Sequence, residues 1–585
     1  MAWDWDLTYL YKDFNDPAFA ADMAELPELN KKLAAAVTAD LPAKEKLEQI
    51  VKADDELSDK LDRLFSFCQL TMSVDATNEA AAQNLDKLMV LSNDVSLTES
   101  AVTRYVGSIE NLDEVIVSSP DLAKVGFALR WDAHSFKHSI PETIEPWILK
   151  MQLSGGSAFS QLRDKLDATH LVSYRGEELP LSAVRGMAYD PDPAVRKEAY
   201  EAEIASYKKM ELPMSFCLNS IKMEARTLAE AEGYDNVLDM TLDQSRMDRE
   251  TLDAMWTAIR EYLPHFRRYL RAKGAYLGHK DGLPFYDLFA PVGKAGKTYT
   301  VEEARAKLVS EMSKFTPAMG EFIDHAFEHH WIDMFPKPGK TGGAFCASVA
   351  TANRSSILTN FQGSFSDVST LAHELGHAWH ARQMAGLPLS MMHEPMPLAE
   401  TASIFNETML SHLVLREASP EEQFSLLESS LMEATQTVVD IYSRFLFESE
   451  VVDTRADHSM SVDELKDAML RAQDASYGDG LDKDVRHPYM WACKSHYYSS
   501  GLNFYNFPYA FGLLFGKGVF AQYLQKGDAF VPVYNQLLRS CGSDTVANVA
   551  ASVGIDVHSV DFWRASLELI RKDIDTFCDL CEKME

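Results

Sequence analysis

Apolar residues recur at the helical period over most of this 585-residue chain, and this pattern constrains the fold more than any other feature. Residues 43–66 show it clearly, with six apolar residues on one helical stripe: Leu47, Ile50, Leu57, Leu61, Leu64 and Phe65. The same spacing continues in four further segments: 191–231, 248–275, 301–333 and 420–450. We therefore expect a mainly α, multi-helix protein.

Strand signals are few. His170–Ser173 and Glu178–Leu181 flank a turn that contains Gly176, which predicts a hairpin. Ser356–Phe361 alternates between polar and apolar residues before Gly363, which predicts another strand. These signals indicate a small antiparallel sheet. We expect a soft domain boundary after the hairpin, dividing the chain into residues 1–185 and 186–585.

The charge and the apolar content limit the partners. A net charge of −32 makes nucleic acid an unfavourable partner, and it could favour cationic peptides, although acidity for solubility alone is the more common reason. No secretory signal is visible, and no run reaches the roughly 18 apolar residues of a membrane span. We therefore expect a cytoplasmic protein with no membrane partner.

Seven cysteines are scattered along the chain, which is not a disulfide framework. Cys578 and Cys581 form a single C-x-x-C near the C-terminus. Because no second pair completes a zinc site, we interpret them as two thiols one turn apart on a terminal helix.

The sequence His373-Glu374-Leu375-Gly376-His377 is an H-E-x-x-H motif. On a helix, residues i and i+4 share one face, so both imidazoles can point at one zinc ion, and Glu374 can reach a water on that ion. Ser364 and Asp367 predict a capped helix start, and Gly386 predicts its end. The motif therefore lies in mid-helix, where this geometry works.

Two histidines leave zinc one protein ligand short. Gln383 stands where the metzincin pattern needs its third histidine, so that class is excluded. His380 would strain a tetrahedron, and we interpret it as a supporting or core residue. Glu400, on a predicted second helix that begins near Pro397, is the preferred third ligand, since its rival Glu394 lies in a proline-bounded loop.

Glu407 falls on the same predicted helix face as Glu400 and Ser403. A carboxylate there can accept the second ring N–H of a ligating histidine, which is the usual support for a metal ligand. The sequence thus predicts a His₂Glu zinc site with Glu374 as the base that activates water.

At these residues the chain resembles the oligoendopeptidase F family, relatives of thimet oligopeptidase. The resemblance rests on four blocks: WDLTYLYKDFNDPAF near the N-terminus, GKTGGAFC at 339–346, ILTNFQGSFSDVSTLAHELGHAWH at 357–380 and FYNFPYAFG at 504–512. It implies a zincin-type helical fold with a deep internal substrate channel. It also implies one zinc ion per chain, held by His373, His377 and Glu400, and cleavage of internal bonds in short unfolded oligopeptides.

The resemblance further supplies transition-state partners from the C-terminal block, which correspond here to His496, Tyr505 and Tyr509. Without it, an aromatic-rich stretch of this kind favours core packing. We also expect Ile357–Phe361 to be a sheet edge on which the peptide lies, and the loop with Gly342 and Gly343 to close over it.

Two other functions remain open. An aminopeptidase would need an acidic group placed for a free N-terminus, and no such motif stands out. A peptide-binding scaffold with structural zinc would have no need of Glu374, and structural zinc prefers four protein ligands. The sequence does not indicate the oligomeric state.

Overall fold

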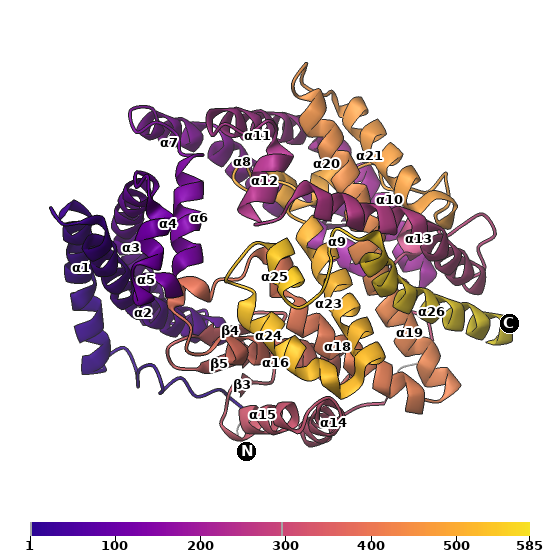
Figure 1. The fold of residues 1–585 in the computed structure, drawn as a ribbon. Coiled ribbons are helices and arrows are strands. Elements are labelled where there is room, and N and C mark those ends of the chain that lie inside the picture. The colour runs from indigo at the N-terminus through magenta and orange to yellow at the C-terminus, as the bar shows by residue number, and fades with distance from the viewer. Residues whose placement is uncertain (1–2, 294–296, 585) are drawn as a thin grey trace. The chain divides into compact units, whose positions relative to one another are not determined.

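The computed structural model describes residues 3–293 and 297–584, and these form two compact units. Unit 1 comprises residues 3–139, 297–414 and 522–554, and unit 2 comprises residues 140–293, 415–521 and 555–584. The boundary predicted at residue 185 falls inside unit 2 and stays a prediction. Figure 1 shows that helices dominate both units, which confirms the mainly α fold.

Unit 1 contains a small sheet among helices. Its elements are α1 (Pro17–Thr38), α2 (Ala43–Val74), α3 (Glu79–Gly107), α4 (Leu112–Val117), α5 (Pro120–Lys124), α6 (Gly126–Phe136), α14 (Val301–Ser313), α15 (Pro317–Glu328), β3 (Ile332–Asp333), β4 (Phe345–Val349), β5 (Arg354–Leu358), α16 (Phe365–Met384), α17 (Met396–Ala399), most of α18 (Thr401–Glu417), α24 (Val531–Ser540) and α25 (Val546–Ser552).

Unit 2 contains helices and one hairpin. Its elements are α7 (Glu145–Ser154), α8 (Gly156–Thr169), β1 (Leu171–Tyr174), β2 (Glu177–Pro180), α9 (Leu181–Gly186), α10 (Pro193–Ser206), α11 (Glu211–Ala231), α12 (Val237–Gln244), α13 (Arg249–Tyr276), α19 (Pro420–Thr435), α20 (Ile441–Thr454), α21 (Val462–Tyr477), α22 (Met490–Cys493), most of α23 (Phe507–Lys526) and α26 (Val560–Met584).

The predicted helical segments are helical, but three of them contain breaks. Residues 191–231 divide into α10 and α11, residues 301–333 into α14 and α15, and residues 420–450 into α19 and α20 around a π turn. Pro213 and Pro317 lie in the first turns of α11 and α15, where a missing N–H costs no hydrogen bond. Proline thus starts new helices inside segments that look continuous.

The hairpin of β1 and β2 is present within one residue of its predicted bounds. Arg175 and Gly176 both have positive φ, 49° and 84°, which suits the right-handed twist of the two strands.

The three-stranded sheet of unit 1 has the order β3-β5-β4, with β5 parallel to β3 and antiparallel to β4. The strand predicted at Ser356–Phe361 therefore exists, but it runs from Arg354 to Leu358. It is also the central strand, so the prediction that it is a sheet edge is wrong. Ser355 to Leu358 are all buried because neighbours cover both sides, and the edge next to α16 is β4.

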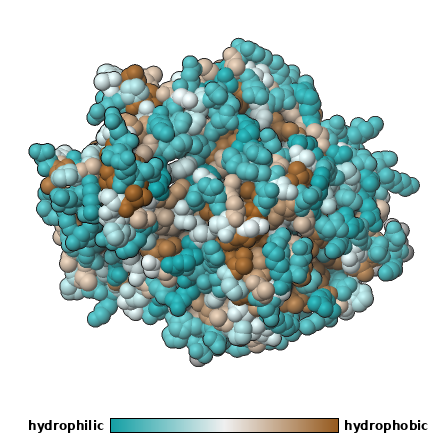
Figure 2. All heavy atoms as spheres, viewed as in Figure 1, coloured by the Kyte–Doolittle hydropathy of each residue, from teal (hydrophilic) through white to brown (hydrophobic). Residues whose placement is uncertain are grey.

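The surface is mostly polar, as Figure 2 shows for one face, with apolar patches between the charged residues. Among the described residues, no helix is both long enough and apolar enough to cross a membrane. Cys578 and Cys581 lie on the terminal helix α26, as the spacing predicts, and both are buried.

Candidate metal centre

The helix α16 carries the H-E-x-x-H motif and begins where the sequence predicts. The Asp367 N–H donates to Ser364 Oγ (3.1 Å), and the Ser364 N–H donates to Asp367 Oδ2 (2.9 Å), which forms a reciprocal capping box. The helix ends at Met384, just before Gly386 with φ of 79°. His373 and His377 therefore lie in mid-helix, one turn apart on one face, with ring centroids 5.0 Å apart.

Glu400 completes the group from the other side. Its Oε2 atom lies 3.2 Å from His373 Nε2 and 3.4 Å from His377 Nε2. Ser403 Oγ holds the carboxylate, donating to the same Oε2 at 2.7 Å. The predicted single helix is broken here, because Glu400 is the turn residue between α17 and α18, with φ of −86° and ψ of 5°.

These donor spacings fit a tetrahedral zinc ion. Zinc lies about 2.0–2.2 Å from nitrogen and carboxylate ligands, which puts neighbouring donors about 3.4 Å apart. The two measured separations are 3.2 and 3.4 Å, and one ligand atom from each of the three residues lies within 4.8 Å of the others. Three protein donors leave the fourth position for water or substrate, which is the pattern of a catalytic site.

Glu407 contacts His373, as predicted. Its Oε2 atom lies 3.3 Å from His373 Nδ1, on the side of the ring away from Glu400. Burial alone would lower the pKa of His373, but the contacts with Glu400 and Glu407 outweigh it and raise that pKa to about 10. Burial would raise the pKa of Glu400, yet its two histidine partners hold it well below its usual range.

Glu374 points into the same cavity without joining the three donors. Its side chain is 6% exposed, and burial raises its pKa, although the two histidines act in the opposite direction. A carboxylate whose proton affinity is raised toward neutral pH suits proton transfer to and from water.

His380 and Glu394, the other candidates for the third ligand, do not join this group of donors. His380 is 2% exposed, and its Nε2 atom lies 3.1 Å from the Leu538 carbonyl oxygen, so it packs in the core between α16 and α24. Glu394 lines the cavity but is not among the three donors that lie together.

The cavity beside these residues has a volume of about 710 Å³ and lies entirely within unit 1. Sequence reasoning did not single out Ser348 of β4 or Ser58 and Asp62 of α2, which line its wall. The wall also includes Phe345 and Cys346, which lie in GKTGGAFC, and Leu61, which the sequence marked only as a position on a helical stripe. GKTGGAFC contains the start of β4 and was a signal for that wall. The α2 residues carry no local signal, since they lie some three hundred positions before the motif.

Close contact between α16 and α18 depends on Gly376, the second variable residue of the motif. A Cβ atom there would lie 2.6 Å from both the Ala402 carbonyl oxygen and the Ser403 Cα atom. Only glycine allows the backbone of α18, which follows Glu400, to approach α16 this closely.

His496, Tyr505 and Tyr509 lie together in unit 2. The rings of His496 and Tyr505 are 6.0 Å apart, and the hydroxyls of Tyr505 and Tyr509 are 2.5 Å apart. Burial, helped by the nearby Arg444 guanidinium, lowers the pKa of His496 to about 3, so its ring is neutral. The structure brings these three residues together, and their catalytic role stays a prediction.

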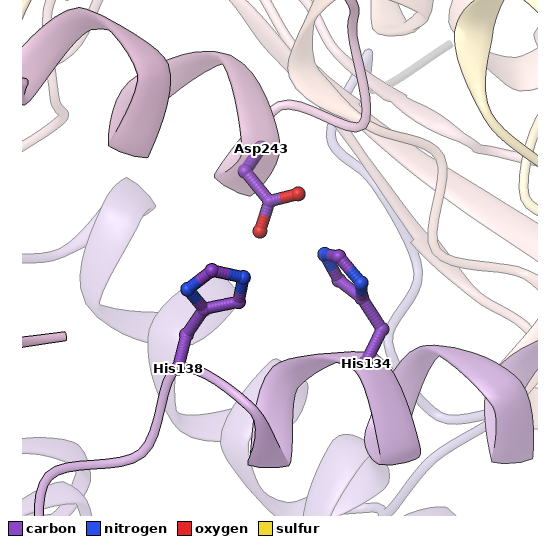
Figure 3. A group of neighbouring side chains, drawn as sticks. All are labelled: His134, His138 and Asp243. Atoms are coloured by element: carbon purple, nitrogen blue, oxygen red, sulfur yellow. The ribbon is translucent and has the colours of Figure 1, made fainter. Parts of the chain in front are cut away.

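A second pair of histidines is shown in Figure 3: His134 lies in the last turn of α6 and His138 just after the helix, with their rings 5.3 Å apart. Asp243, which the figure also draws, belongs to α12 in unit 2. Two histidines alone fall short of the three protein ligands of a catalytic zinc site.

A family model described as peptidase family M3 matches residues 186–569. The chain is 23% identical to the group B oligopeptidase PepB of Streptococcus agalactiae, over 97% of this chain and 96% of that protein. It is 24% identical to an oligoendopeptidase F homolog of Lactococcus lactis and 23% identical to oligopeptidase PepF of Bacillus subtilis. Those two alignments span 64% and 58% of the relatives' lengths, which is less than two thirds.

Two solved structures share the fold. A candidate peptidase from Chlamydophila abortus superposes with a TM-score of 0.86 at 22% identity, covering 99% of this chain and 98% of that one. Oligoendopeptidase F from Enterococcus faecium superposes with a TM-score of 0.72 at 16% identity, covering 97% and 99%.

Proposed function

This chain belongs to peptidase family M3 and is a metallopeptidase, and on that premise we propose that it is a zinc-dependent endopeptidase acting on internal bonds of short, unfolded oligopeptides. The observation that carries the proposal is the group of His373, His377 and Glu400, whose donor separations of 3.2 and 3.4 Å suit one zinc ion. Glu374 opens into the same cavity.

When bound, zinc supplies a Lewis acid that polarises a carbonyl and acidifies water. The Glu374 carboxylate takes a proton from the attacking water and later passes it to the leaving amine. Its buried position supports this role, because burial raises its proton affinity. Glu407 keeps the ring of His373 in place through the Nδ1 atom, on the side of the ring away from Glu400.

The substrate lies along β4. This strand pairs with β5 on one side, and Phe345, Cys346 and Ser348 line the cavity. The backbone groups on its other side can pair with an extended peptide, which adds to the sheet as a further strand. The role assigned from the sequence to Ile357–Phe361 thus passes to the neighbouring strand.

His496, Tyr505 and Tyr509 act on the developing oxyanion in this proposal. A neutral His496 still carries one ring N–H that can donate a hydrogen bond, and the tyrosine hydroxyls are further donors. The support is the resemblance of the C-terminal block together with the clustering of the three side chains.

Digestion of a mixed peptide library by the zinc-loaded protein tests this function, with fragments identified by mass spectrometry. We expect cuts at internal bonds and their loss after chelation of the metal. Stepwise removal of single N-terminal residues would indicate an aminopeptidase instead. Peptides that bind but stay intact would indicate a scaffold.

A further inference from the structure

The wall that α2 contributes to the cavity bears a carboxylate that the proposed chemistry does not use. Ser58, Leu61 and Asp62 follow one another on a single helical face, and that face of α2 packs against β4 and the turn Leu389–Met391. Asp62 thus lines the same cavity as the metal ligands and β4.

Asp62 is positioned by the end of β4. Burial raises the pKa of the Asp62 carboxyl, whereas the Ser66 hydroxyl, 3.4 Å away, and the Ala350 N–H just after the strand act in the opposite direction. The His393 side chain also lowers the pKa of the Asp62 carboxyl, so it lies near Asp62. His393 and Glu394, which follow one another in the chain, both line the cavity.

Apart from the histidines, the charged groups of this wall are carboxylates. Beyond Glu374 and Glu400, the cavity is lined by the carboxylates of Asp62 and Glu394, and among the residues described to line it there is no lysine or arginine. The basic side chains described on the wall are all histidines. Such a cavity attracts a cationic side chain and repels an anionic one.

Resting on the function proposed above, we propose that Asp62, assisted by Glu394, selects oligopeptides that carry a lysine or arginine close to the scissile bond. The cationic head would meet Asp62 at the Ala350 end of β4, while the stem of the side chain lies along Leu61. The substrate class is thus a basic oligopeptide, and Asp62 is the residue that recognises its charge.

Internally quenched peptides test this. A set with one sequence is varied at single positions on both sides of the cut to lysine, glutamine or glutamate. We expect the wild-type enzyme to prefer lysine over glutamate at one position in kcat/KM. Asp62→Asn should lower that lysine-to-glutamate ratio about tenfold and leave the glutamine peptide nearly unchanged. The ratio should also fall as salt is added.

Two variants make the result specific. Glu56→Gln is the matched control, since Glu56 lies on the same helix but pairs with Lys32 and does not line the cavity. Asp62→Lys should reverse the preference toward glutamate. Cleavage of the glutamine peptide shows that each variant is folded and active.

An unchanged lysine-to-glutamate ratio in Asp62→Asn would overturn the role of Asp62, while internal cleavage of the glutamine peptide would leave the endopeptidase intact. If the wild-type enzyme cuts none of the peptides, the endopeptidase proposal itself fails. The two failures are therefore distinguishable.

Discussion

At the scale of the single residue, Glu374 and Glu400 differ in what they face. Glu400 Oε2 lies between two imidazole nitrogens at 3.2 and 3.4 Å, whereas Glu374 lines the cavity outside that group. The first position suits a ligand and the second a base, and substitution by glutamine separates the two roles because it keeps the shape and removes the charge.

Glu374→Gln should therefore retain zinc and fold normally while kcat falls about 10²–10⁴-fold, the usual share of general acid–base catalysis. KM should change little, because the lost interaction belongs to the transition state. Zinc content and turnover measured on one preparation check this. Glu400→Gln is the contrast and should lose zinc. Near-normal turnover of Glu374→Gln with full zinc would contradict the assignment of the base.

The Nε2 atom of His496, in unit 2, is buried without a hydrogen-bond partner among the described residues. If the Nε2 group forms a hydrogen bond to the oxyanion, His496→Ala should lower kcat about 10²–10³-fold with little change in KM or in melting temperature. Tyr509→Phe should behave similarly. Variants that unfold easily but keep normal specific activity would make these residues part of the core instead.

At the scale of the element, the pair of α16 and α18 is held together by a glycine contact. In Gly376→Ala the new methyl group meets the backbone at Ala402 and Ser403, which cannot rotate away as a side chain would. Overpacking of this kind costs typically about 1–3 kcal/mol and outweighs the better helix propensity of alanine. We expect a lower melting temperature and weaker zinc binding, because Glu400 precedes α18.

Gly186→Ala, in α9, is the control for the Gly376→Ala substitution. Gly186 has a helical φ of −60°, and a Cβ atom there meets nothing within 4 Å, so this variant should be neutral or slightly stabilised. Equal behaviour of the two variants would mean that the close approach at Gly376 does not matter.

The helices α2, α3 and α6 share a cluster of acidic side chains. Burial, together with repulsion from Glu99, raises the pKa of Asp54 to about 7, and burial raises that of Asp132 to about 6. The folded protein thus holds protons that the unfolded chain releases near pH 4. This stabilisation is complete at low pH and is lost as the pH rises through about 7.

Asp54→Asn mimics the protonated state at every pH. Its melting temperature should exceed that of the wild type at pH 8, and the difference should vanish near pH 4. The change from 3.8 to about 7 sets an upper limit of about 4 kcal/mol on the gain. Thermal unfolding across this range checks it, with Glu56→Gln expected to show no such gain, because its pKa is lowered by Lys32. A constant offset at all pH values would rule out the linkage.

At the scale of the whole molecule, the candidate metal group and Glu374 line a cavity of about 710 Å³, and on the proposed function this cavity decides which substrates reach them. An extended peptide can lie along β4, whereas a folded domain presents no free strand of that length. We expect peptides of about a dozen residues from a small disulfide-bonded protein to be cut. The native form of the same protein should stay intact, as measured by mass spectrometry. Efficient digestion of the native form would contradict this selection.

Local patterns in the sequence predicted the helical character of the chain and the three residues that lie together as a candidate metal group. Helical period, the Ser364–Asp367 cap and the i, i+4 spacing of His373 and His377 are local, so they do not depend on what packs against them. Glu400 could be predicted for a similar reason, because a helix that follows after a short connection usually packs against the helix before it.

Other features depend on contacts between segments that lie far apart in the sequence. The strand β5 is central because β3, which comes earlier in the chain, pairs with its other side and leaves β4 at an edge. The turn at Glu400 and the need for glycine at Gly376 follow from how closely two helices pack. Asp62 reaches the cavity because α2 folds against β4. Contacts between residues far apart in sequence leave no periodic signal in either segment, so local patterns cannot reveal them.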